Sequence, residues 1–173
     1  MASLSIMTAK PTPPSQSKSH PKRKFLVVVD TTDECRVATR YAARRAQHTN
    51  GIVTLLCIIG PSNFQQWGGV ERVMREEAHE EAERLLHDWA KYANDLTGNM
   101  PELIVREGRT EEEIRKLFSE EVAVSILVLA AGTSKEGPGP LVSALAGKGD
   151  PGYTIPVTVV PGNLSDEAID ALA

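Results

Sequence analysis

Five short apolar segments, separated by stretches with helical periodicity, restrict the fold of this chain more than any other feature. The segments are residues 25–29, 52–59, 102–106, 126–130 and 155–160, which have the lengths of β-strands and are rich in aliphatic side chains. Strands that alternate with helices are joined by right-handed crossovers and lie parallel. We therefore predict an α/β fold with a doubly wound, five-stranded parallel sheet.

The stretches between the strands predict the helices. The longest, residues 70–96, carries its apolar side chains along one stripe, as an amphipathic helix does when it covers a sheet. We expect the other helices after residues 30 and 109, at 141–146 and at 165–172. Thr110 and Glu113 have the spacing of a capping box, which predicts the start of the third helix.

Two of the five strands are expected at the edges of the sheet. The segment 102–106 is partly polar, which suits a strand with one side in water. Pro156 lies within the last segment and has no N–H for a central ladder, so it favours an edge or the start of a strand.

A glycine- and proline-rich loop follows the fourth strand and leads into the short helix 141–146. Pro140 suits the first helical position, and Gly147 suits the position that ends a helix. Such a junction places backbone N–H groups and the positive end of a helix dipole at the carboxyl edge of the sheet, where phosphate groups are commonly held. The loop matches neither a Walker loop nor a dinucleotide fingerprint. Spacing alone therefore leaves both anion binding and a purely structural turn open.

Charge and composition exclude several classes of function. The net charge is −4, but the first 24 residues carry five basic and no acidic side chains, which leaves 14 basic and 23 acidic side chains in the rest. An acidic body has no general attraction to nucleic acids. No apolar run approaches a membrane span, and the start lacks the pattern of a signal peptide, so we expect no membrane association and a cytoplasmic location.

The same composition predicts how the chain is organised. Residues 1–23 are rich in Ser, Pro, Thr and Lys and are expected to form a disordered basic tail. Residues 24–161 are expected to form one domain, and residues 162–173 a short C-terminal helix.

The residues that carry reactive groups do not form a catalytic pattern. His79, Glu83 and His87 share one helix face, but their surroundings favour a solvated polar surface over a metal site, so we expect no metal. Cys35 lies in the first turn of a helix, where the dipole is expected to lower its pKa. No base is paired with it, and Cys57 has the sequence context of a core residue. We therefore expect binding rather than enzymatic turnover.

Three segments, in order, resemble the universal stress protein family. They are Val29-Asp30-Thr31-Thr32 at the end of the first strand, Ile104-Val105-Arg106-Glu107-Gly108, and the late glycine loop followed by Ile155-Pro156-Val157. The resemblance spans about residues 24–161. It implies the adenine nucleotide alpha-hydrolase-like fold, a role in stress response, and a homodimer formed through the last strand.

The resemblance also implies a nucleotide site. Nucleotide-binding members carry a glycine, two residues, a second glycine, nine residues, and a third glycine followed by Ser or Thr. Gly137 and Gly147 keep the nine-residue gap, whereas Ser134 and Lys148 replace the first glycine and the final hydroxyl residue. The candidate nucleotide-binding residues are Asp30, Ile58, Gly132, Thr133, Ser134, Lys135, Gly137, Gly147 and Lys148.

Three functions stay open at this point. The first is a regulatory switch that holds ATP or another adenine nucleotide. The second is a nucleotide-free dimeric module that contacts a protein partner through the aromatic segment containing Phe64 and Trp67. The third is slow ATP hydrolysis, for which no general base is evident near the loop. If the chain forms the dimer that the resemblance implies, the C-terminal helix is expected to dock across the interface between the two chains.

Overall fold

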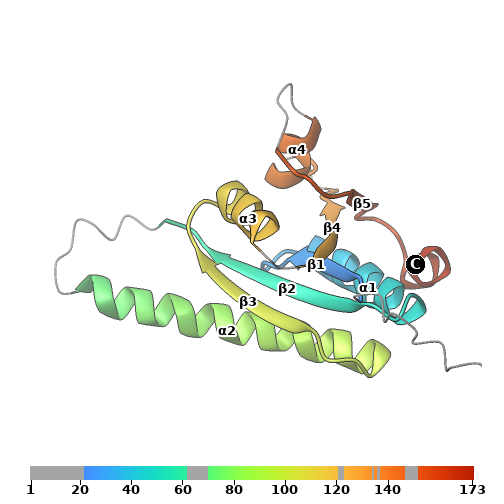
Figure 1. The fold of residues 1–173 in the computed structure, drawn as a ribbon, viewed down its shortest axis with the longest axis horizontal. Coiled ribbons are helices and arrows are strands. Elements are labelled where there is room, and N and C mark those ends of the chain that lie inside the picture. The colour runs from blue at the N-terminus through green and yellow to red at the C-terminus, as the bar shows by residue number, and fades with distance from the viewer. Residues whose placement is uncertain (1–21, 62–69, 121–122, 134, 136, 147–151) are drawn as a thin grey trace, which may run out of the picture.

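A computed structural model describes residues 22–61, 70–120, 123–133, 135, 137–146 and 152–173, and it forms a sheet covered by helices on both faces (Figure 1). The strands are β1 (Lys24–Val28), β2 (Ile52–Ile59), β3 (Glu102–Glu107), β4 (Val124–Ala131) and β5 (Val157–Pro161). The helices are α1 (Asp33–His48), α2 (Val70–Thr97), α3 (Thr110–Ser119), α4 (Pro140–Ala146) and α5 (Asp166–Leu172). None of the helices in these ranges is both long and apolar enough to cross a bilayer.

The sheet is parallel throughout, with the strand order β3-β2-β1-β4-β5. This confirms the predicted doubly wound, five-stranded architecture. The predicted edges are also confirmed, because β3 and β5 are the outer strands. Pro156 directly precedes β5, and its carbonyl accepts a hydrogen bond from the Leu127 N–H, so the missing N–H of the proline costs the ladder nothing.

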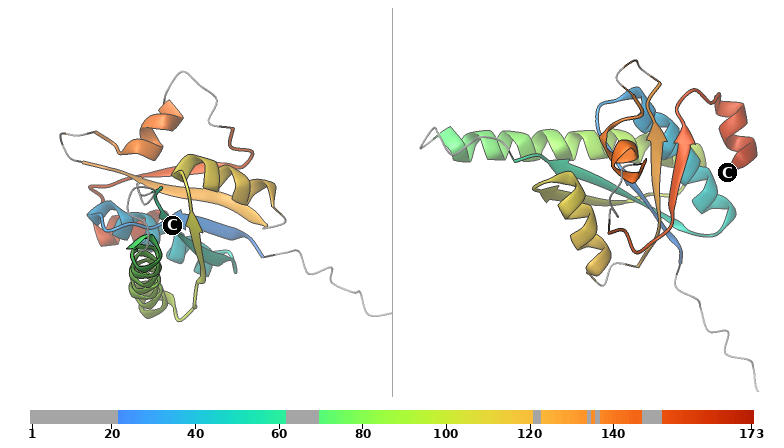
Figure 2. Two further views of the ribbon diagram at one scale, coloured as in Figure 1. Left: turned by 90° about the vertical axis from the view of Figure 1, so that its left-hand side faces the viewer. Right: turned by 90° about the horizontal axis from the view of Figure 1, so that it is seen from above.

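Alternate residues of the central strand β1 contribute to two separate cores. Phe25 and Val27 pack with α1 and α2 on one face, whereas Leu26 packs with Ile114 and Leu117 of α3 on the other. All five side chains are at most 1% exposed. Figure 2 shows the resulting layers, with α1 and α2 on one side of the sheet and α3 and α4 on the other. This two-sided burial explains why the central strands are continuous apolar runs.

The start of α3 differs from the sequence prediction. Thr110 is the first residue of the helix, its N-cap is Arg109, and no side chain caps the first turn. The Glu113 carboxylate accepts a hydrogen bond from Lys116 Nζ at 2.5 Å and lies beside Gly108, just before the N-cap, but makes no capping hydrogen bond. The capping-box prediction is therefore wrong, because Thr110 lies within the helix instead of at its N-cap.

The C-terminal helix α5 packs against α1 of the same chain. Ile169 has no exposed surface and belongs to the core on the α1 side of the sheet. Around it, three arginines of α1 and two aspartates of α5 form an ion-pair network, the α1–α5 latch, which consists of Arg36, Arg40, Arg44, Asp166 and Asp170. Ile169 is therefore buried within its own chain, whereas Leu172 is 62% exposed, and the docking of this helix across a dimer interface stays a prediction.

The latch predicts a dependence of stability on pH. The Arg40 guanidinium, which donates two hydrogen bonds to Asp170, lowers the pKa of that carboxyl from 3.8 to about 2. A carboxyl whose pKa is lower in the folded state stabilises the fold above its unfolded pKa, and this stabilisation is lost as the pH falls from about 4 to about 2. We expect Asp170→Asn to reduce the free energy of unfolding by about 1 kcal/mol at pH 7, because the carboxylate is one-third exposed and partly screened.

Urea unfolding of wild type and Asp170→Asn at pH 7 and at pH 2.5 measures this effect. The difference between the two proteins should shrink at the lower pH. Asp95→Asn is the matched control, because Asp95 pairs only with exposed Lys91 on the same helix. A difference that is equal at both pH values would show that the Asp170 carboxylate contributes nothing through its charge.

Candidate functional site

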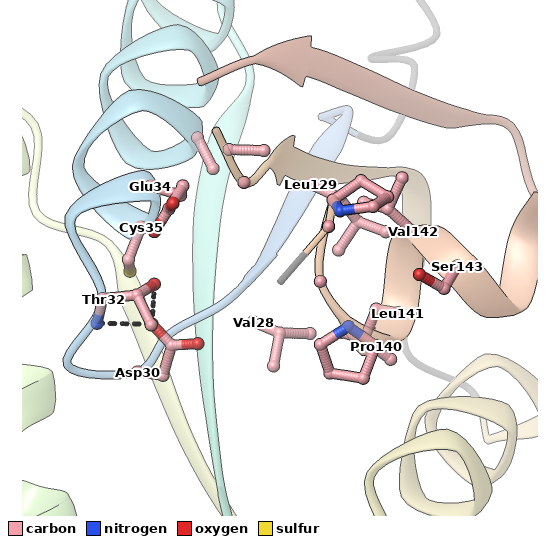
Figure 3. Close-up of a pocket in the computed structure, with 16 residues that line it drawn as sticks. Val28, Asp30, Thr32, Glu34, Cys35, Leu129, Pro140, Leu141, Val142 and Ser143 are labelled. Atoms are coloured by element: carbon pink, nitrogen blue, oxygen red, sulfur yellow. Dashed lines mark hydrogen bonds between the residues drawn. The ribbon is translucent and has the colours of Figure 1, made fainter. Parts of the chain in front are cut away.

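The site lies where the connections of the sheet diverge. The chain leaves β1 through α1 on one face of the sheet, and it leaves the neighbouring strand β4 through α4 on the other face. In open α/β sheets this divergence leaves a crevice outside the carboxyl ends of the two strands, where ligands commonly bind. A cleft of about 530 Å³ opens at this position in the present chain (Figure 3).

Two walls of different character face each other across the cleft. Figure 3 shows Asp30, Thr32 and Glu34 on the side of α1, opposite Pro140 and Ser143 on the side of α4. Between them lie apolar side chains from the strand ends and the helices. These apolar residues are Val28, Ala38, Leu129, Ala130, Leu141 and Val142. The cleft therefore combines an apolar interior with a small number of polar groups, as small-molecule sites usually do.

Asp30 is held in one orientation from two directions. Its Oδ1 accepts hydrogen bonds from the Thr32 N–H at 2.8 Å and from Thr32 Oγ1 at 2.5 Å, which is the local turn that aspartate favours. Its backbone carbonyl accepts a hydrogen bond from Trp89 Nε1 of α2 at 3.0 Å. The carboxylate is thus fixed at the exposed mouth of the cleft without a cation to neutralise it among the residues that line the cleft.

The glycine loop is closed by its own backbone. The Gly132 N–H donates to the Pro138 carbonyl at 3.1 Å, and a Cβ at Gly132 would lie 2.9 Å from the Gly137 carbonyl oxygen. Gly137 and Gly139 have φ values of +101° and +92°, which other residues rarely adopt. Helix α4 then begins at Pro140, as the sequence predicts. The Gly132 N–H is thus already paired in this structure, and the assignment of Gly132 to a nucleotide site stays a prediction.

A second hollow of about 380 Å³ adjoins the cleft and shares Val28, Asp30, Pro140 and Leu141 with it. It is lined by Ile58 from β2 and by the first residues of α3. The two arginines there, Arg109 and Arg115, each form an ion pair with a glutamate of α3, at 3.5 Å and 3.6 Å. The contribution of α3 was not foreseen from the sequence, because its residues follow β3, which is separated from β1 by β2.

The structure brings together some of the candidate residues and not others. Asp30, Gly132 and Gly137 line the cleft, and Ile58 lines the adjoining hollow. Thr133 and Lys135 are exposed and line neither. Ser134, Gly147 and Lys148 lie outside the described residues, as do Phe64 and Trp67 of the aromatic segment.

Three polar residues of the cleft, Thr32, Glu34 and Ser143, were not among the candidate site residues predicted from the sequence. Glu34 follows Asp30 by four residues and lies in the first turn of α1, and this proximity is the only local signal for it. Nothing in the sequence near Ser143 distinguishes it from other serines.

The expectation for Cys35 is also wrong. Burial raises the pKa of its thiol to about 12, although the residue lies in the first turn of α1. Its Sγ lies 3.9 Å from Thr39 Oγ1, within the apolar packing of the helix against the sheet. Desolvation of a thiolate therefore outweighs the helix dipole here. The two histidines of the polar cluster on α2 each have a partner within the protein. His79 hydrogen-bonds to Glu107 of β3, and His87 hydrogen-bonds to the Glu83 carbonyl.

Comparison with known proteins places this geometry in a family. The family model described as "Universal stress protein family" matches residues 22–145. No curated protein matches the chain. Among solved structures, universal stress protein UspA from Lactobacillus plantarum is similar, with 16% identity, a TM-score of 0.65, and coverage of 82% of this chain and 99% of that chain.

Two further similar structures contain adenine ligands. One is a universal stress protein in complex with cAMP, with 16% identity, a TM-score of 0.59, and coverage of 83% of this chain and all of the other. The second is the universal stress protein from Archaeoglobus fulgidus in complex with dAMP, with 17% identity, a TM-score of 0.59, and coverage of 82% and 99%. At these identities the likeness concerns the fold. Because the family model covers more than two-thirds of the sequence, the chain belongs to the universal stress protein family.

Proposed function

We propose that this universal stress protein acts in the stress response by binding an adenine nucleotide in the cleft between α1 and α4. The observation that carries the proposal is the position of the cleft, because it joins the fixed Asp30 carboxylate and the glycine loop at the switch point of the sheet. Two proteins of similar fold are described in complex with cAMP and dAMP. They support an adenine ligand as the class to test first.

The chemistry of the cleft suits such a ligand. Its volume of about 530 Å³ lies within the range of small-molecule sites. Val28 and Leu141 are common to the cleft and the hollow and offer apolar surface for a base, with Ile58 beside them. The Asp30 carboxylate accepts hydrogen bonds and so suits the amino group of adenine or the hydroxyl groups of ribose. These roles require binding and orientation, and no chemical step.

The experiment is calorimetric titration of adenosine, AMP, cAMP and ATP into wild type and Asp30→Asn. Asparagine keeps the turn with Thr32 but removes the charge, so we expect affinity for the bound ligand to fall by about tenfold. Asp33→Asn is the matched control, because Asp33 is an exposed neighbour in the first turn of α1 and does not line the cleft. Absence of binding by all four ligands at millimolar concentration would overturn the proposal.

A second function, the nucleotide-free dimeric module, is favoured by a separate observation. Strand β5 is an edge strand, and its Val159 is 41% exposed. At the far end of the molecule, Val70, Val73 and Met74 expose apolar surface on the first turns of α2, which extend beyond the sheet (Figure 1). We propose that two chains pair through β5 and that a protein partner contacts α2. Native mass spectrometry of the purified protein separates the functions, since a ligand-free dimer that ignores added nucleotide would favour the module.

A further inference from the structure

Glu34 lies on the side of the cleft that adjoins the first residue of the glycine loop. A Cβ at Gly132 would lie 3.3 Å from Glu34 Oε1, and a Cβ at Gly162 would lie 3.3 Å from Glu34 Cγ. The two glycines therefore leave space for the glutamate, with its stem beside Gly162 and its carboxylate beside the first residue of the loop. The side chain is half-buried and is drawn above Asp30 on the same wall in Figure 3.

The charges that line the described cleft are all negative. Asp30 and Glu34 are its ionisable carboxylates, and no lysine, arginine or histidine is among its lining residues. Lys135 is exposed and does not line the cleft. In the adjoining hollow, Arg109 and Arg115 are paired with glutamates of α3. Among the described lining residues, the charged groups that a phosphate in this cleft would meet are therefore the two carboxylates.

The backbone of the described loop also offers few donors to an anion. The Gly132 N–H is paired with the Pro138 carbonyl, and the Ser143 N–H with the Gly139 carbonyl. Pro138 and Pro140 have no N–H. Helix α4 has seven residues and so brings only a short dipole to the loop. On the opposite wall, the positive end of α1 already carries the acidic residues of its own first turn.

We propose that the cleft selects an uncharged adenine nucleoside over ATP and that Glu34 determines this specificity. The inference rests on the proposed function and narrows its ligand from adenine nucleotides in general to the adenine compound with the least phosphate charge. Carboxylates accept hydrogen bonds from ribose hydroxyls and from the adenine amino group, which a nucleoside presents in full. Each added phosphate brings negative charge towards Asp30 and Glu34, so affinity should fall in the order adenosine, AMP, ATP.

The test compares dissociation constants of adenosine, AMP and ATP, measured by calorimetry in EDTA so that no divalent cation bridges the carboxylates. We expect the dissociation constant of ATP to exceed that of adenosine by at least about tenfold at 50 mM salt. The ratio of these two constants should decrease at about 500 mM salt, where exposed charges are screened. Glu34→Gln should lower the ratio of the ATP and adenosine dissociation constants by about fivefold at low salt, because it removes one of the two negative charges in the cleft.

Glu77→Gln is the matched control, because Glu77 is exposed on α2 and is not among the residues that line the cleft. The substitution changes the net charge but should leave the ratio of the two dissociation constants unchanged. The salt dependence of the wild type tests the same inference without any substitution. Binding of ATP as tightly as adenosine to the wild type would overturn the selectivity while leaving the proposed function intact. Failure of every adenine ligand to bind would overturn the proposed function, and this inference with it.

Discussion

Replacing Ile169 with alanine is expected to lower the free energy of unfolding by about 2–4 kcal/mol, the usual cost of truncating a fully buried aliphatic side chain. Ile169 is the buried residue of α5, with 0% exposure, and it packs into the core on the α1 side of the sheet. The loss combines the transfer of the missing methyl and methylene groups with the cavity that they leave.

Leu172→Ala is the matched control. Leu172 is in the same helix but is 62% exposed, so its truncation should change stability by less than about 0.5 kcal/mol. Urea unfolding at several protein concentrations measures both variants. If α5 packs against its own chain, the loss in Ile169→Ala is independent of concentration. A loss that disappears as the protein is diluted would instead place Ile169 at an interface between chains.

Replacing Gly162 with alanine is expected to cost about 2–4 kcal/mol, within the range of severe overpacking. A Cβ at this position would lie 2.3 Å from the Ala131 carbonyl oxygen, which itself accepts a hydrogen bond from the Gly162 N–H at 3.0 Å. Because both contacts are with backbone at the end of β4, relief requires β4 and the chain after β5 to separate. The same movement would displace Glu34, whose stem lies beside Gly162.

Gly60→Ala provides the control for this prediction. Gly60 also follows a strand, but a Cβ there meets no atom within 4 Å and its φ is not in the left-handed region. We expect its unfolding free energy to stay within about 0.5 kcal/mol of wild type. Equal stability of Gly162→Ala and wild type in urea unfolding would show that β4 and β5 do not approach as closely as the structure places them.

The sequence by itself determined the elements and their class. Apolar runs such as 126–130 identify buried strands because burial on both faces demands aliphatic side chains at every position. Pro140 marks the start of α4 and Pro156 the approach to β5 because proline has no N–H and a fixed φ. These signals are local, and each depends on the residue itself and its near neighbours.

The tertiary structure decided which residues share a site. Glu34 and Gly132 are distant in the chain, and only the adjacency of β1 and β4 brings the carboxylate to the loop. The same adjacency pairs the Gly132 N–H with a carbonyl and leaves Lys135 outside the cleft. The spacing of residues along the chain does not reveal the order of strands in the sheet. The set of residues that line the cleft could therefore not be predicted from the sequence.

Packing also decided the properties of single residues. Cys35 has the helix position of a low-pKa thiol, yet burial under the sheet raises its pKa. Arg40 and Asp170 are 130 positions apart, and their hydrogen bonds hold α5 against α1 of its own chain. Local sequence determines backbone conformation because its physical causes act over a few residues. Desolvation, ion pairing and shape depend on segments that meet only after folding, and these determine the site.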